Sequence, residues 1–164
     1  MRSLSSVLAG VLLLAASAVP AQAQPDQVVL RSSGLPGQAL EAKAKNGKVF
    51  TAARHGGPTQ RWAIHHDDEG RFAVVTHPAS ESCLTGNEPD NVRVLDCIGA
   101  QSQSWVVRRA PGGLVSLANA LTPELCLTAL GENRPTALHP CSDHPRQLWR
   151  PVGVAPASVE ADAV

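Results

Sequence analysis

The chain has 164 residues, and its 14 basic and 14 acidic side chains give a formal net charge of zero at pH 7. This balance excludes a strongly basic protein that binds nucleic acid through the phosphates, and no acidic run indicates a disordered tail. Only 3% of the residues are aromatic, namely three tryptophans and two phenylalanines, so each large ring needs an explanation.

The first 23 residues have the pattern of a cleavable signal peptide. Arg2 gives a short basic start, an apolar run extends over residues 7–19, and Ala21-Gln22-Ala23 has the small residues that signal peptidase recognises. The run is shorter than the roughly 20 residues of a membrane anchor. We therefore predict a secreted or periplasmic protein without membrane association, cleaved after Ala23. Residues 24–152 then form one domain, followed by a mobile tail over 153–164.

Three motifs of the form Gln-x-Trp recur along the mature chain. They are Gln60-Arg61-Trp62, Gln103-Ser104-Trp105 and Gln147-Leu148-Trp149. Their tryptophans are 43 and 44 residues apart. The cysteines repeat in the same way, with 43 residues between Cys83 and Cys126 and 44 between Cys97 and Cys141. The sequence therefore predicts three copies of one unit.

Four cysteines in a secreted chain predict two disulfides, for which the sequence allows three pairings. In the first unit the two cysteine positions hold Ala39 and Arg54, so both cysteines are missing together. This favours pairing within a unit over pairing between units, and we predict Cys83–Cys97 and Cys126–Cys141. Each bridge closes a loop of about 15 residues, which corresponds to about 3 kcal/mol in the chain-entropy model.

Short apolar or alternating runs between turn signals indicate β-strands. Residues 72–75, 92–94 and 114–117 are such runs, and Asn46-Gly47 and Gly112-Gly113 are turn signals. A period of this length also suits propeller blades, but three units are fewer than the roughly four blades that a propeller needs. We therefore expect an all-β domain whose three units close on one another.

The Gln-x-Trp motifs, the Cys-Leu starts at Cys83 and Cys126 and the glycine-led strands resemble the ricin B-type lectin domain over about residues 26–152. The resemblance implies a β-trefoil of three pseudo-symmetric four-stranded units. It also implies that the three tryptophans pack in the core and that the three glutamines satisfy buried backbone groups. Val28, Phe72 and Val115 occupy matching positions and are expected in the core.

In this family an aspartate directly follows Cys-Leu, an aromatic residue lies two before the second cysteine, and an asparagine often precedes the Gln of Gln-x-Trp. These supply the polar groups and the apolar face that a sugar needs. The present chain departs at all three places. The positions hold Glu41, Thr85 and Thr128 for the aspartate, Ala52, Leu95 and His139 for the aromatic residue, and Thr59, Ser102 and Arg146 for the asparagine.

The third unit keeps the most binding chemistry, and the resemblance assigns a candidate carbohydrate site to Thr128, His139, Asp143 and Arg146. A second candidate in the first unit combines Glu41 with Phe50. The alternative for both sets is a group of solvated loop residues. No complete family set remains, so we expect degenerate sites of low affinity.

No motif indicates catalysis, and we expect no catalytic residue, no metal and no cofactor. The run "HHDDE" at 65–69 places adjacent residues on opposite faces of a strand, where they do not converge on one ion. We expect His55, His77 and His144 to be exposed. The function that follows is a monomeric, secreted carbohydrate-binding module with a glycan partner. The alternative is a non-catalytic trefoil, an inhibitor or accessory subunit, that binds a secreted protein through its loops.

Overall fold

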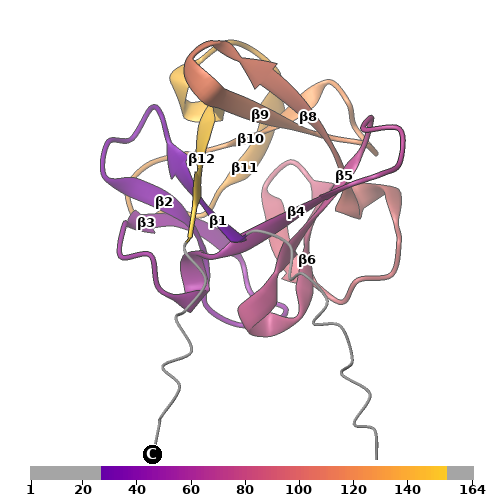
Figure 1. Ribbon diagram of the computed structural model, residues 1–164, viewed down its shortest axis with the longest axis horizontal. Helices are drawn as coiled ribbons and strands as arrows, with labels where there is room; N and C mark the ends of the chain where they lie inside the picture. Colours follow the sequence, from indigo (N-terminus) through magenta and orange to yellow (C-terminus); the bar gives the residue numbers. More distant parts are fainter. Residues whose placement is uncertain (1–26, 155–164) are drawn as a thin grey trace, which may run out of the picture.

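The computed structural model describes residues 27–154, which form a twelve-stranded all-β trefoil (Figure 1). The predicted signal peptide and residues 155–164 of the predicted tail lie outside the described residues. The first unit consists of β1 (Gln27–Ser32), β2 (Gln38–Ala42), β3 (Val49–Ala53) and β4 (Trp62–His66). The second consists of β5 (Ala73–His77), β6 (Ser82–Glu88), β7 (Asn91–Leu95) and β8 (Ser104–Ala110). The third consists of β9 (Leu114–Asn119), β10 (Leu125–Thr128), β11 (Ala137–Pro140) and β12 (Trp149–Gly153).

Five 3-10 turns connect the strands, and three of them carry the repeated glutamines. Those three are η1 (Pro58–Gln60), η3 (Gln101–Gln103) and η5 (Pro145–Gln147). The other two are η2 (Pro78–Ser80) and η4 (Pro111–Gly113).

The first and last strands of the units form a closed ring, in which each strand pairs with the next in the order β1, β4, β5, β8, β9, β12. The ring closes where β12 lies antiparallel to β1, from Val28 opposite Gly153 to Ser32 opposite Trp149 (Figure 1). The backbone N–H of Val154 also donates to the Gln27 carbonyl at 2.8 Å. Closure leaves the ring without unpaired edges.

The second and third strands of each unit form hairpins, and the hairpins hold one another at one end of the ring. The N–H of Thr136 donates to the Val49 carbonyl at 2.8 Å, and the N–H of Val94 donates to the Gly47 carbonyl at 3.0 Å. The N–H of Leu138 donates to the Pro89 carbonyl at 2.6 Å. Each hairpin therefore depends on its neighbours around the pseudo-threefold axis.

The three tryptophans lie in one core, as predicted, and each is 0% exposed. Every indole N–H donates to a backbone carbonyl on the second strand of its own unit. The acceptors are Leu40 at 3.0 Å, Leu84 at 2.9 Å and Leu127 at 3.2 Å. The largest side chains thus bury their area without leaving the polar N–H unsatisfied.

The three glutamines hold the chain that follows the hairpin, which confirms their predicted role. In each unit the side-chain oxygen accepts a backbone N–H, from His55 and Gly56, from Ile98 or from Ser142. The side-chain nitrogen donates to the carbonyl of Ala53, Asp96 or Pro140. In each unit, one side-chain amide therefore pairs with backbone N–H and C=O groups at the end of the hairpin and in the loop that follows it.

Both disulfides have the predicted pairing. Cys83 is joined to Cys97 and Cys126 to Cys141, with Cα–Cα distances of 5.1 Å and 4.9 Å. Ala39 is buried at the first cysteine position of the first unit, and Arg54 is exposed at the second.

The prediction that Phe72 belongs to the core is wrong, because its side chain is 40% exposed. Val28 pairs with Trp62 and Val115 with Trp149, and the residue that pairs with Trp105 is Ala73. The second unit has one residue fewer between its first two strands, since Thr76 pairs with Cys83 seven residues later, whereas Ala118 pairs with Cys126 eight residues later. The predicted match of Phe72 with Val28 and Val115 is therefore wrong by one residue, and Ala73 is the equivalent residue of the second unit.

Candidate functional site

The third unit contains a hollow of about 290 Å³ between the β10–β11 hairpin and η5. Three of the four residues predicted there line it, namely Thr128, His139 and Arg146. His144 and Ser142 also line it, whereas Asp143 is exposed and outside the lining. The fold thus brings together residues from β10, β11 and η5 that lie up to 18 positions apart in sequence.

Hydrogen bonds fix the rim of this hollow. The guanidinium of Arg146 donates through Nη1 to the Leu130 carbonyl at 3.0 Å. Its backbone N–H donates to Nδ1 of His144 at 3.2 Å, so Nε2 carries the proton of that ring when it is neutral. The Ser142 hydroxyl donates to the Gln147 side chain at 3.2 Å. The rim is therefore ordered before a ligand arrives and offers mainly N–H donors.

Thr128 forms the floor and is only 6% exposed. Its hydroxyl donates to the Cys126 carbonyl at 2.9 Å and accepts from Nε2 of Gln147 at 3.0 Å. Thr85 has the same two contacts in the second unit, with Cys83 and Gln103. The threonine is part of the scaffold, and one lone pair of its oxygen remains for a ligand hydroxyl.

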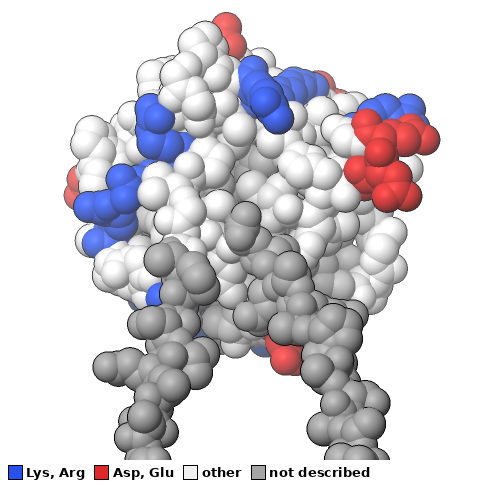
Figure 2. All heavy atoms as spheres, in the orientation of Figure 1, with Lys and Arg blue, Asp and Glu red and all other residues white. Residues whose placement is uncertain are grey.

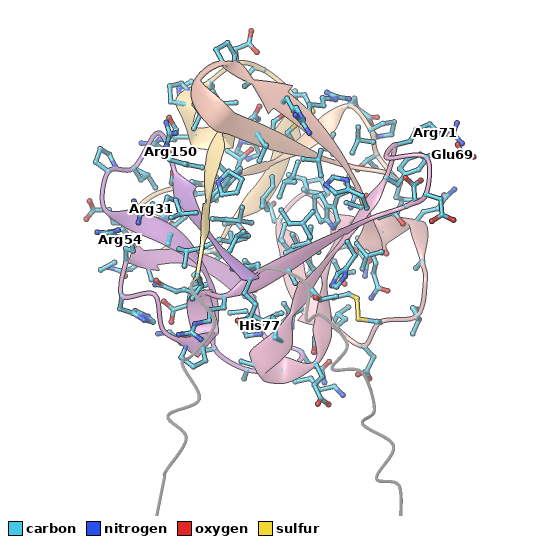
Figure 3. All side chains as sticks on the ribbon, in the orientation of Figure 1. Arg31, Arg54, Glu69, Arg71, His77 and Arg150 are labelled. Carbon is cyan, nitrogen blue, oxygen red and sulfur yellow. A yellow bond between two sulfur atoms is a disulfide. The ribbon has the colours of Figure 1, made fainter. Side chains whose placement is uncertain are left out.

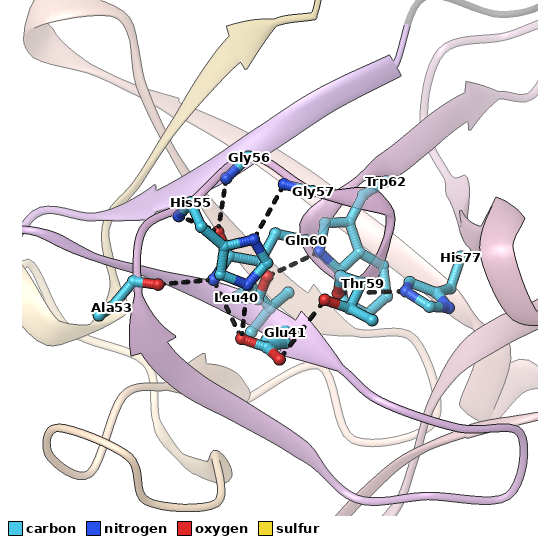
Figure 4. Close-up of polar contacts among 10 residues, drawn as sticks. All are labelled: Leu40, Glu41, Ala53, His55, Gly56, Gly57, Thr59, Gln60, Trp62 and His77. Carbon is cyan, nitrogen blue, oxygen red and sulfur yellow. Dashed lines mark hydrogen bonds and ion pairs between the residues drawn. The ribbon is translucent and has the colours of Figure 1, made fainter.

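The carboxylate of the first unit, Glu41, is engaged by its own unit (Figure 4). It is 5% exposed and accepts from Nε2 of Gln60 at 3.0 Å and from the Thr59 hydroxyl at 3.4 Å. Nε2 of His55 lies 3.4 Å from the same carboxylate. Phe50 lies opposite Glu41 across the β2–β3 pair, is half-buried and forms a backbone bridge to Pro135.

His77 is a buried residue that the sequence prediction placed at the surface, and that prediction is wrong. It is 1% exposed, with Nδ1 2.7 Å from the Ser80 hydroxyl and Nε2 3.2 Å from the Thr59 carbonyl. Its ring packs on Trp62 with centroids 4.9 Å apart. Burial lowers the pKa of His77, while the hydrogen bond to Thr59 and the charge of Glu41 act in the opposite direction. His55 and His144 are exposed, as expected.

The repeat contains a signal for the burial of His77. The equivalent residue of the third unit is Asn119, which directly follows Ala118 as His77 follows Thr76. Asn119 is fully buried and donates through Nδ2 to the Ser102 carbonyl at 3.0 Å. Both side chains therefore contact the residue before the Gln of the preceding unit.

The profile of the family described as ricin-type beta-trefoil lectin domain matches residues 26–149. The chain belongs to this family. No curated protein sequence matches it. The designed threefold-symmetric protein ThreeFoil superposes with a TM-score of 0.70 at 18% identity, over 78% of this chain and 99% of that one.

Two further solved structures have the same fold, one as a whole chain and one as part of a longer chain. The Rhizoctonia solani agglutinin has a TM-score of 0.64 at 16% identity, over 83% of this chain and 100% of its own. A mosquitocidal holotoxin has a TM-score of 0.72 at 14% identity, over 80% of this chain but only 17% of its own length. At these identities the likeness shows the trefoil fold.

Residues 27–154 also bear on metal binding and on membrane insertion. Within that range no group of three or more His, Cys, Asp or Glu side chains could hold a metal ion. The same residues include no helix that is long and apolar enough to cross a membrane.

Proposed function

We propose that this lectin domain is an exported carbohydrate-binding module that binds a glycan weakly through its third unit. The observation that carries the proposal is the hollow lined by Thr128, His139 and Arg146, which the fold assembles at the position expected from the family pattern. A sugar there takes hydrogen bonds from the Arg146 guanidinium and covers the His139 ring with its C–H face. Asp143 lies next to the rim and serves as an outer contact.

The first and second units act as scaffold in this proposal. In the second, Leu95 stands where the third unit has His139, and Thr85 is 1% exposed. In the first, the Glu41 carboxylate is held by Gln60 and Thr59, and Phe50 is half-buried, so that candidate pair contributes little. One site per chain gives no avidity, and the dissociation constant is then on the order of millimolar.

Export is supported by the two disulfides, which persist in oxidising compartments outside the cytosol. The partner in this proposal is a glycan, and the protein acts as a monomer without a catalytic step.

A glycan array followed by titration of each hit tests the proposal. We expect His139→Ala to weaken binding by about tenfold, because it removes the ring that covers the sugar. His66→Ala is the matched control, since His66 is exposed on β4 and lies outside the hollow. Equal affinity in both variants would remove the third-unit site.

Silence of the wild-type protein across the array would favour the alternative, a trefoil that binds a secreted protein through its loops. Capture of partners from the exported fraction of the producing cell then identifies the protein, and His139→Ala has no effect on that capture.

A further inference from the structure

A second hollow, of about 260 Å³, lies at the junction where β12 of the third unit meets β1 of the first. Arg31 of β1, Arg150 of β12 and Arg54, which follows β3, all line it. These arginines lie on one side of the molecule (Figure 3), and basic atoms gather on that side of the surface (Figure 2). No lining residue among those described is acidic.

Two of these arginines lie directly opposite each other. Arg31 and Arg150 are Cα partners in the antiparallel pair of β1 with β12. Like charges at such a position are destabilising. The ion pairs found within residues 27–154 join Lys45 to Asp96, His55 to Glu41 and Arg71 to Glu69, so none of them neutralises the three arginines. Arg150 donates through one nitrogen to the Gly112 carbonyl at 2.8 Å and keeps its other donors.

Buried polar groups without partners concentrate in the same hollow. Within residues 27–154 four buried side-chain atoms have no hydrogen-bond partner, and three of them are Nε of Arg31, Oγ of Ser32 and Oε1 of Gln38. Ser32 and Gln38 are each 7% exposed, and both line the hollow. A rotation of the Gln38 amide by half a turn presents its NH₂ group instead of its oxygen. Orphaned groups of this kind are costly unless a ligand satisfies them.

The other two units show that the fold does not need these charges. The junction of the first and second units has a hollow lined by the equivalent residues, which are neutral where this one is basic. The register equates Arg31 with Thr76 and Ala118, Arg150 with Ala63 and Val106, and Arg54 with Cys97 and Cys141.

At two further positions of this junction the side chains are shorter than in the other units, and one of these differences removes a negative charge. Gly37 stands where the other units have Glu81 and Glu124. Ser32 stands where they have His77 and Asn119, whose longer side chains reach a backbone carbonyl.

We propose that this junction is a binding site for a sulfate or phosphate group, either as the free ion or as a group carried on a sugar. The three guanidinium groups supply charge-assisted hydrogen bonds to the oxygens of the ion. The Ser32 hydroxyl and the Nε–H of Arg31 complete the donor set. The ion also offsets the repulsion between Arg31 and Arg150. The site is separate from the hollow in the third unit and does not depend on it.

Titration calorimetry in chloride buffer tests the site with four probes: sodium sulfate, sodium phosphate, galactose 6-sulfate and galactose. We expect saturable binding of one sulfate or phosphate per chain. Any heat of binding from galactose should be the same in Arg54→Gln as in the wild type. Arg54→Gln and Arg150→Gln should each weaken binding by about tenfold or more. Binding of galactose 6-sulfate identifies a sugar-borne group, and binding of the inorganic ions alone identifies the free ion.

The control is Arg108→Gln, because Arg108 is an exposed strand arginine that donates to the Pro123 carbonyl at 3.1 Å, as Arg150 does to Gly112. It removes the same charge outside the hollow and should leave binding unchanged. His139→Ala should also leave sulfate binding unchanged, which separates this site from the proposed glycan site. Absence of saturable sulfate and phosphate binding, or equal weakening by Arg108→Gln, overturns the proposal.

Urea denaturation shows whether the variants are folded and gives a second measurement of sulfate binding. Sulfate stabilises folded proteins in general, so the relevant quantity is the excess shift in the urea midpoint over that of Arg150→Gln. In chloride alone, Arg150→Gln should unfold at a urea concentration no lower than the wild type, because the variant removes the opposed charge. A sulfate shift that is identical in both proteins contradicts the site.

Discussion

Each Gln-x-Trp glutamine connects a loop backbone to the hairpin beside it, and Gln103 illustrates the energetic consequence. It is 3% exposed, accepts from the Ile98 N–H at 2.9 Å and donates to the Asp96 carbonyl at 2.7 Å. Gln103→Leu keeps the size of the side chain but removes these partners. We expect the free energy of unfolding to fall by about 2 kcal/mol in urea denaturation. Gln101→Leu, in the same turn but exposed, should change it by less than about 0.5 kcal/mol.

His77 gives the protein a pH-dependent stability at the level of a single side chain. Its pKa in the folded state lies below the ordinary value of 6.5, chiefly because burial disfavours the charged ring. The unfolded chain therefore binds more protons as the pH falls below 6.5, and stability is lost with falling pH towards the folded pKa.

The asparagine found at the equivalent place in the third unit supplies the test. We expect the free energy of unfolding of the wild type to fall between about pH 7.5 and about pH 5.5, and that of His77→Asn to fall less. Urea denaturation at the two pH values measures both. Parallel changes in the two proteins would mean that other groups cause the pH dependence.

At the scale of the elements, the sequence predicts the features that recur in register and misses those that depend on small shifts. The tryptophans, glutamines and cysteines keep their spacing, so the three units and both disulfides could be predicted. Phe72 could not be placed, because one residue fewer between β5 and β6 changes which side chain faces the core. The family positions predicted three residues that line the hollow of the third unit, whereas Asp143 shows that closeness in sequence does not place a side chain in the lining.

The junction of arginines was missed for a different reason. Arg31, Arg54 and Arg150 come from three separate segments, and only the pairing of β12 with β1 brings them together. The sequence shows that Arg54 replaces a cysteine of the other units, but it does not show which residues lie near Arg54 in space.

The two disulfide hairpins should contribute equally to stability, because the bridges span 14 and 15 residues. Replacing Cys83 and Cys97 together by alanine should lower the free energy of unfolding by about 3 kcal/mol, and the same change at Cys126 and Cys141 should match it within about 1 kcal/mol. The β2–β3 hairpin pairs over five residues on each strand without a bridge, so both variants should keep their strands. Urea denaturation gives the energies and far-ultraviolet circular dichroism the strand content. Loss of strands in either variant would contradict the prediction.

At the scale of the whole molecule, the chain closes on itself with the same kind of junction that joins its units. β12 pairs with β1 as β4 pairs with β5 and β8 with β9, and the two ends of the described chain lie side by side (Figure 1). The junction of β12 with β1 is therefore structurally similar to the two junctions at which the chain continues from one unit to the next.

This pseudo-symmetry predicts that the protein tolerates new ends in a turn between units. A permuted chain would join Val154 to Gln27 through a short glycine-serine linker and begin at Gly70, in the exposed turn between β4 and β5. We expect it to unfold cooperatively with a free energy within about 2 kcal/mol of the wild type, since no strand pair is interrupted. Tryptophan fluorescence in urea reports the transition, because all three indoles are buried in the shared core.

A second permuted chain, with the same linker but opened between Val74 and Val75, is the control. β5 pairs on one side with β4 and on the other with β8, and Val75 is 0% exposed, so this break removes backbone bonds inside the ring. It should expose the tryptophans and lose the cooperative transition. If both permuted chains fold equally well, the closed ring is not what holds the three units together; if neither folds, the ends are not interchangeable with the junctions between units.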